Sequence, residues 1–289
     1  MAVEAPPAVA EPVVAATRPS GARRRDTARS WALGVWSALA LLYLFIPIFV
    51  IVVFSFNDNK GRFNFTWQGF TLEHWKHPFS NPDLATAIQN SLSIALICTI
   101  IATALGTFMA MALVRYGFRG RSIVDFFVFL PLSTPEVVIG AALLALFLTM
   151  TVNTGFATIV IAHVMFTVSY VVVTVKARLE GMDRHIEEAA MDLGATEWTT
   201  FRKVTLPLIA PAVLASLLLC FAISVDDFVV TYFNAGNRIT FPLFVWGSAR
   251  VGAPPQVNVI GTAIFVVAVA AMVGSVLVQN RRLRAAAAA

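Results

Sequence analysis

The sequence predicts an all-α integral membrane protein with six transmembrane helices. Of its 289 residues, 58% are hydrophobic and 13% are charged, whereas a soluble domain has about 45–50% apolar and about 25% charged residues. Six apolar stretches reach the length of about 20 residues that a bilayer crossing needs. A helix is the open-chain structure that satisfies its own backbone in lipid. The composition therefore argues against a water-soluble globular enzyme.

The six stretches are separated by segments that are rich in charged or turn-forming residues. Proline residues inside two of them, Pro47 in the first and Pro131 and Pro135 in the third, predict kinked helices. The expected spans are residues 31–56, 85–114, 123–150, 156–175, 207–231 and 257–278.

The basic residues predict the orientation of these spans. If the N-terminus is cytoplasmic, only five of the 21 Lys and Arg residues fall in outside segments. Those five are Lys60, Arg62, Lys76, Arg238 and Arg250. Because cytoplasmic loops carry an excess of Lys and Arg, this distribution selects an N-in, C-in topology. The formal net charge of +5 is thus a topology signal, and it does not indicate a nucleic-acid partner.

The two ends of the chain lie outside the expected membrane domain. Residues 1–30 are rich in Ala and Pro and then basic, and Pro6, Pro7 and Pro12 would break the apolar helix of a signal peptide. We expect a disordered cytoplasmic tail over residues 1–30, a transmembrane domain over residues 31–283, and a short C-terminal tail over residues 284–289.

The inside segment 176–206 carries both signs of charge and contains no apolar run long enough to span. Asp183 is placed to cap a first helix, Gly194 to stop it, and Thr196 to cap a second helix. The sequence therefore predicts two short cytoplasmic helices between spans 4 and 5. Acidic and small side chains on the first helix suit insertion into a groove of a soluble partner.

This segment resembles the EAA motif of bacterial ABC-importer permeases, which is written EAA-x3-G-x9-I-x-L-P. The matching residues are Glu188, Ala189, Ala190, Gly194, Val204, Leu206 and Pro207. Val204 stands where isoleucine is usual. In that family the loop is the coupling helix that docks on the ATPase subunit, so the resemblance implies that these residues are the ATPase-coupling site. The alternative is an ordinary amphipathic connecting helix at the membrane surface.

Further stretches resemble the permeases of spermidine/putrescine importers. They are SFN (55–57), TWQGFT (66–71), NSLSIA (90–95), RYGFRG (115–120) and SVDDFVV (224–230). The resemblance implies a type I ABC-importer permease fold, with the core permease part at about residues 85–280, in the bacterial cytoplasmic (inner) membrane. It also implies three partners besides lipid: a second permease subunit, an ATPase dimer that binds ATP and Mg, and an extracytoplasmic polyamine-binding protein.

Three carboxylates inside apolar stretches are candidate substrate-pathway residues: Glu136, Asp226 and Asp227. A carboxylate at the bilayer centre costs about 2.5–3.5 kcal/mol on insertion scales. A path for a chain of ammonium groups needs carboxylates and aromatic faces, and Tyr232 and Trp246 supply aromatic rings nearby.

The alternative role for these acids is structural. Adjacent helical residues point about 100° apart, so one of Asp226 and Asp227 would face the path while the other holds a neighbouring helix. The aspartate pair could also bind backbone amides at a helix end, and Glu136 could cap a helix that restarts after Pro135.

The sequence predicts neither catalysis nor metal binding in this chain. The ATP-binding pattern G-x4-G-K-[ST] is absent, and no nucleophile and base are spaced for covalent catalysis. Cys98 and Cys220 lie in apolar runs and are expected to pack in the core. His163 is expected to be a hydrogen-bonded packing residue. We expect no cofactor here, because ATP and Mg would be held by the partner ATPase.

These observations favour a non-catalytic transport subunit of an ATP-driven polyamine importer. Two alternatives stay open. One is an ABC permease for another small solute, such as sulfate, molybdate, iron or thiamine, although carboxylates in the path argue against anions. The other is an ion-coupled secondary transporter that uses Glu136 and Asp226.

Overall fold

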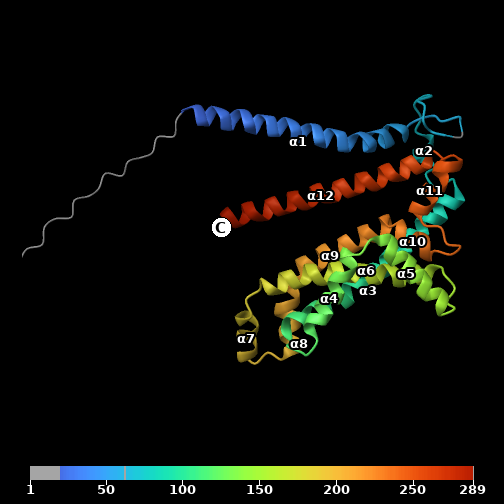
Figure 1. Ribbon diagram of the computed structural model, residues 1–289. Coiled ribbons are helices and arrows are strands. Elements are labelled where there is room, and N and C mark those ends of the chain that lie inside the picture. Colours follow the sequence, from blue (N-terminus) through green and yellow to red (C-terminus); the bar gives the residue numbers. More distant parts are fainter. Residues whose placement is uncertain (1–19, 62, 289) are drawn as a thin grey trace, which may run out of the picture. The chain divides into compact units, whose positions relative to one another are not determined.

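The computed structural model describes residues 20–61 and 63–288, and most of them are helical (Figure 1). The chain divides into two units, Met1–Val53 and Phe54–Ala289. Residues 1–19 of the expected tail lie outside the described residues. The helix α1 (Ser20–Phe54) begins within that expected tail, and α12 (Gln256–Ala288) continues into the expected C-terminal tail.

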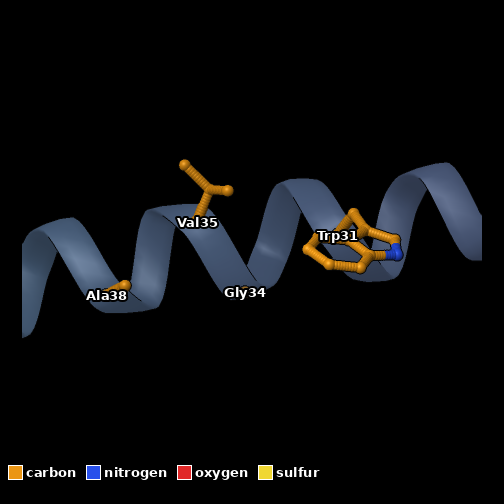
Figure 2. Close-up of a pocket in the computed structure, with 4 residues that line it drawn as sticks. All are labelled: Trp31, Gly34, Val35 and Ala38. Carbon is orange, nitrogen blue, oxygen red and sulfur yellow. The ribbon is translucent and has the colours of Figure 1, made fainter.

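The first unit consists of most of α1. Its apolar part, Leu33–Phe54, is long enough to cross a membrane, and most of its side chains are exposed. A shallow notch of about 370 Å³ is lined by Trp31, Gly34, Val35 and Ala38. Figure 2 shows these four residues along α1. Because one helix alone lines this notch, it reflects two small residues one turn apart rather than a binding site.

Two parallel helices, α3 (Pro82–Arg115) and α6 (Phe156–Glu180), form the centre of the second unit. Near the middle of the two helices, Cys98 Sγ lies 3.5 Å from Thr167 Oγ1. Further along, Gly106 packs so closely on Val171 that a Cβ at Gly106 would lie 2.6 Å from the Val171 Cβ. Residue numbers therefore increase in the same direction along both helices, which means that the helices are parallel. The absence of a side chain at Gly106 permits their close approach.

The third core helix, α9 (Leu206–Asp226), runs antiparallel to α6. Arg178 Nε donates to the Leu208 carbonyl at 3.1 Å, and Cys220 Sγ lies 3.5 Å from the Thr167 carbonyl. Both cysteines are buried in this packing and unpaired, as the sequence predicted. The three helices form the main core of the unit.

The segment between α3 and α6 returns along the core as two helices, α4 (Arg121–Ser133) and α5 (Glu136–Thr149), which meet at a bend of 111°. Asp125 Oδ1 accepts from Lys176 Nζ at 2.6 Å, so α4 begins beside the C-terminal part of α6. Since α3 and α6 are parallel, this broken pair brings the chain back from one end of the core to the other.

Proline chemistry explains the break. Pro135 has no N–H, and its ring forces Thr134 into extended backbone with φ −88° and ψ 133°. The Thr134 hydroxyl donates instead to the Leu130 carbonyl at 2.7 Å. The kink predicted in the 123–150 stretch is confirmed at Pro135, whereas Pro131 lies inside α4.

Length and composition identify four candidate spans among the residues searched, or five if the bent pair is one span. Besides Leu33–Phe54, these are Pro82–Arg115, Phe156–Glu180, Glu197–Asp226 and the pair Arg121–Ser133 with Glu136–Thr149. The expected sixth stretch falls in α12, whose searched apolar part, Gln256–Ala270, is shorter than a span.

Smaller elements close the end of the core where α3 begins. The 57–84 segment contains α2 (Glu73–Lys76) and a bridge between Asn57 and Phe70. On α11 (Phe241–Val251), the Phe241 N–H donates to Ser91 Oγ of α3 at 2.9 Å. Leu84 of α3 packs with Val257 and other apolar residues of α11 and α12.

Candidate functional site

The loop that follows α6 lies at the end of the core opposite α10 (Val229–Asn234) and α11 (Figure 1). It contains α7 (His185–Asp192), α8 (Glu197–Thr200) and a π-helical turn, η1 (Phe201–Thr205), which runs on into α9. The first predicted short helix is confirmed as α7, whereas the second does not end at Pro207, because α8, η1 and α9 run on as one continuous helix over Glu197–Asp226.

Local polar contacts set the ends of these helices. Asp183 Oδ1 accepts from the His185 N–H at 3.0 Å, and Thr196 Oγ1 accepts from the Thr199 N–H at 3.3 Å. Between the helices, Gly194 has φ +86° and no atom within 4 Å of an added Cβ. Glycine is favoured there by backbone conformation and not by crowding.

The predicted coupling residues of α7 lie on its open side. Glu188 and Ala189 are exposed and Ala190 is half-buried. Leu193, directly before Gly194, is 90% exposed. Ile186, Met191 and Trp198 are exposed apolar side chains in the same loop, so the loop offers an apolar surface around an acidic residue.

The last three motif residues lie where the loop joins the core. Val204 is half-buried in η1, and Leu206 and Pro207 are exposed at the start of α9. The Leu206 N–H donates to the Phe201 carbonyl, which makes the π-helical turn. Such turns insert one residue into a helix and are frequent at functional sites.

The structure corrects the role expected for Glu187, one of the acidic residues of the first helix that the sequence predicts to face a soluble partner. This residue is only 4% exposed, and its carboxylate binds the guanidinium of Arg115 and the hydroxyl of Thr205. Arg115 begins the stretch RYGFRG (115–120), and the EAA motif begins one residue after Glu187. A groove of about 500 Å³ runs past these three residues and Trp198.

The second candidate region is the break between α9 and α10. Asp226 ends α9 and is exposed. The next side chain, Asp227, is 4% exposed, and its Oδ2 accepts from the N–H and hydroxyl of Thr231 at 2.7 and 2.8 Å. The two acids thus lie in different surroundings, and Asp227 caps the start of α10.

His163 connects this break to α6. Its Nδ1 lies 2.7 Å from Ser224 Oγ, and its Nε2 lies 2.9 Å from Thr231 Oγ1 and 3.2 Å from Asp227 Oδ2. The ring is 1% exposed. It is a hydrogen-bonded packing residue, as predicted, and it joins α6, α9 and α10.

The aromatic candidates meet through a third ring. The centroid of Phe228 lies 5.7 Å from that of Tyr232 and 5.2 Å from that of Trp246. The guanidinium of Arg250 lies 4.8 Å from the centre of the Trp246 ring, a cation–π distance. The structure therefore joins Tyr232 and Trp246 in one cluster, which holds a cation from the chain itself.

Glu136 lies on a different helix from this aromatic cluster. It is the first residue of α5 and is exposed. One turn later Gly140 packs against Val230 and Phe233 of α10, and its carbonyl accepts from Asn234 Nδ2 at 3.3 Å. Glu136 and the acids at the α9–α10 break therefore belong to elements that pack on each other.

A helical core with parallel α3 and α6, a broken return segment and an exposed EAA loop defines a membrane permease. Residues 102–287 match the family model of the binding-protein-dependent transport system inner membrane component. The chain belongs to this family. It is a non-catalytic permease component and is located in the inner membrane.

Individual relatives agree with this assignment. The chain is 39% identical to the spermidine/putrescine transport system permease protein PotC of Escherichia coli K12 over 243 residues, which cover 84% of this chain and 91% of PotC. Identity is 40% to PotC of Haemophilus influenzae, over 83% of this chain and 93% of the relative. The chain is also 38% identical to the putrescine transport system permease protein PotI of E. coli K12, over 78% of this chain and 83% of PotI.

Solved structures share the fold at low sequence identity. A chain of a bacterial ABC transporter that imports alginate aligns with a TM-score of 0.61 and 16% identity, over 91% of this chain and 98% of that one. A chain of an amino acid ABC transporter aligns with a TM-score of 0.53 and 18% identity, over 74% of this chain and 100% of that one.

Proposed function

We propose that this chain is the PotC-like permease subunit of an ATP-driven importer of polyamines, with spermidine or putrescine as cargo. The main support for this proposal is the sequence identity of 38–40% to relatives that are named for these substrates. The alignments cover most of this chain and most of each relative. Exposed carboxylates and aromatic rings near the α9–α10 break supply the groups that a polyammonium chain would contact.

The proposal includes six membrane crossings with both termini in the cytoplasm. The parallel course of α3 and α6 supports counting the broken α4–α5 pair as one crossing, because the chain has to return between them. The basic residues Arg115, Lys176 and Arg178 lie toward the α7 end of the core, which the positive-inside rule places in the cytoplasm. The sixth crossing would be α12.

At that cytoplasmic end, α7 would be the coupling helix of the importer. Its exposed Glu188 and Ala189, together with the apolar surface at Leu193, suit a cleft on an ATPase subunit. The assembly would comprise a PotB-like second permease, a PotA-like ATPase dimer that holds ATP and Mg, and a PotD-like extracytoplasmic binding protein. A solved alginate ABC transporter in complex with its periplasmic protein has a chain of this fold.

For the pathway we propose Asp226, Glu136, Tyr232 and Trp246 as residues that contact the cargo. The carboxylate of Asp227 already binds Thr231 and lies beside His163. We therefore propose that Asp226 faces the path while Asp227 holds α10 in place, which divides the two roles expected for this pair.

Uptake by the assembled transporter in proteoliposomes tests this function. Labelled spermidine and putrescine should enter only with ATP and the binding protein, and Asp226→Asn should slow uptake while Glu180→Gln, an exposed charge at the end of α6, should not. Uptake of a different solute would move the chain to another importer of the family. Uptake by the purified chain alone under an ion gradient would favour a secondary transporter.

A further inference from the structure

The helix α7 is connected to all three helices of the core. It follows α6 directly through residues 181–184. Glu187, on its buried side, binds Arg115, the last residue of α3, and Thr205, the last residue of η1 before α9. We call Arg115, Glu187 and Thr205 the Glu187 anchor.

The geometry of the anchor is specific. Arg115 Nη1 pairs with Glu187 Oε2, and Arg115 Nη2 donates to Glu187 Oε1, which also accepts from the Thr205 hydroxyl. Such a two-point pairing fixes direction as well as distance. The two charged side chains are 17% and 5% exposed, so water and salt screen the pair far less than an open one.

The neighbouring residue has the opposite environment. Glu188 is exposed, and adjacent helical side chains point about 100° apart. One side of α7 is thus free for a partner while Glu187 is fixed to the chain's own core. Besides the Glu187 anchor, α7 is connected to the core through residues 181–184 and through the turn at Gly194.

We propose that Arg115, Glu187 and Thr205 are positioning residues that make α7 move as one rigid body with α3, α6 and α9. This inference rests on the proposed function of α7 as the ATPase contact, because a rigid connection is what would carry a partner's displacement into the membrane helices.

The first test measures rigidity in the permease itself. Spin labels at Leu193→Cys and Leu96→Cys, with Cys98 and Cys220 replaced by Ala, report the distance between α7 and the middle of α3. Leu96 lies 19 residues before Arg115, about 28 Å along a helix, a separation suited to spin-label measurements. Glu187→Gln and Thr205→Val should broaden the distance distribution.

The matched control is Asp192→Asn, which removes one charge from an exposed position of the same helix and should leave the distribution narrow. The exchange Arg115→Glu with Glu187→Arg should restore it. An unchanged width in Glu187→Gln overturns the proposal. So does a broad distribution in the exchanged pair, if its melting temperature equals that of the wild type.

The second test measures coupling in the assembled transporter. Glu187→Gln should raise the ATP hydrolysed per cargo molecule imported by about fivefold or more, the lower range of allosteric coupling. Arg115→Lys should raise this ratio by less than Glu187→Gln does, because lysine keeps the charge but cannot make the two-point pairing with Glu187. A wild-type ratio in Glu187→Gln contradicts the inference.

The proposed function of α7 and the proposed role of the Glu187 anchor can be contradicted independently of each other. If a cross-linker at Glu188→Cys does not reach an ATPase subunit, the proposed function of α7 fails. The spin-label distances, which need no ATPase, decide the Glu187 anchor on their own.

Discussion

His163 Nε2 lies 3.2 Å from Asp227 Oδ2 in a region closed to solvent, and the same ring nitrogen lies 2.9 Å from Thr231 Oγ1. Through these contacts one side chain of α6 fixes the place where α9 ends and α10 begins. Without His163, the buried Asp227 carboxylate would keep its hydrogen bonds from Thr231 but lose the partner with which it pairs its charge, which is costly.

His163→Ala should therefore destabilise the permease strongly. The substitution removes one hydrogen-bond partner from the Asp227 carboxylate and one from the Ser224 hydroxyl. Each loss is expected to lower the free energy of unfolding by about 1–3 kcal/mol. Thermal unfolding in detergent measures this loss. Asp226→Asn serves as the control because its carboxylate is exposed, and a melting temperature equal to that of the wild type is expected there. Equal melting temperatures for the two variants would contradict a structural role of His163.

Gly106→Ala should loosen the packing of α3 on α6. The added Cβ would lie 2.6 Å from the Val171 Cβ and 3.1 Å from the Val168 carbonyl, and overpacking a core costs about 1–3 kcal/mol. Gly247→Ala in α11 is the matched control, since nothing lies within 4 Å of its added Cβ. The comparison of their unfolding temperatures tests the close approach of the parallel helices.

Gly194→Ala should strain the turn between α7 and α8. At φ +86° a Cβ costs about 1–2 kcal/mol through the backbone alone, and the open space around it excludes a steric cause. Gly194→Asn should be milder, because asparagine enters this conformation more readily. Proteolysis of the loop reports the effect. Equal cleavage of Gly194→Ala and wild type would show that the turn tolerates a side chain.

His185 should titrate above its ordinary range. A hydrogen bond to Asp183 raises the pKa of His185, and the backbone N–H of His185, followed by its ring, lowers the pKa of Asp183. For His185 the contribution to stability is fully present below 6.5, its ordinary value, and is lost as pH rises through the raised pKa. For Asp183 it is present above 3.8 and is lost as pH falls through the lowered pKa.

Asp183→Asn is accordingly expected to lower the pKa of His185, as followed by the NMR signals of the labelled histidine ring over a pH series. An identical titration curve in the variant would show that the 2.7 Å contact between His185 Nδ1 and Asp183 Oδ1 is not kept in solution.

Local chemistry made much of the fold predictable. The stop at Gly194, the cap at Thr196 and the bend at Pro135 each depend on backbone preferences of one or two residues, and all three are observed. The expected packing role of His163 is also observed. Because such signals act over a few residues, they can be taken directly from the order of amino acids.

Other features could not be predicted, because they require helices that are distant in sequence to meet. Glu187 is separated by 72 residues from Arg115, and the motif drew attention to the exposed Glu188 beside it. The cation over Trp246 comes from Arg250, which the sequence analysis used only to orient the spans. In each case the pattern identified the residue type but not its partner.

The sequence by itself determined that the chain is helical, apolar enough to lie in a membrane, and equipped with a short helical loop that resembles a coupling motif. These properties follow from hydropathy and from local backbone preferences. Only the tertiary structure decided that α3 packs closely on α6 at Gly106, that the Asp227 side chain is buried while Asp226 is exposed, and that Glu187 joins α7 to the core. Those outcomes depend on which helix faces pack together, and burial then assigns adjacent carboxylates to different surroundings.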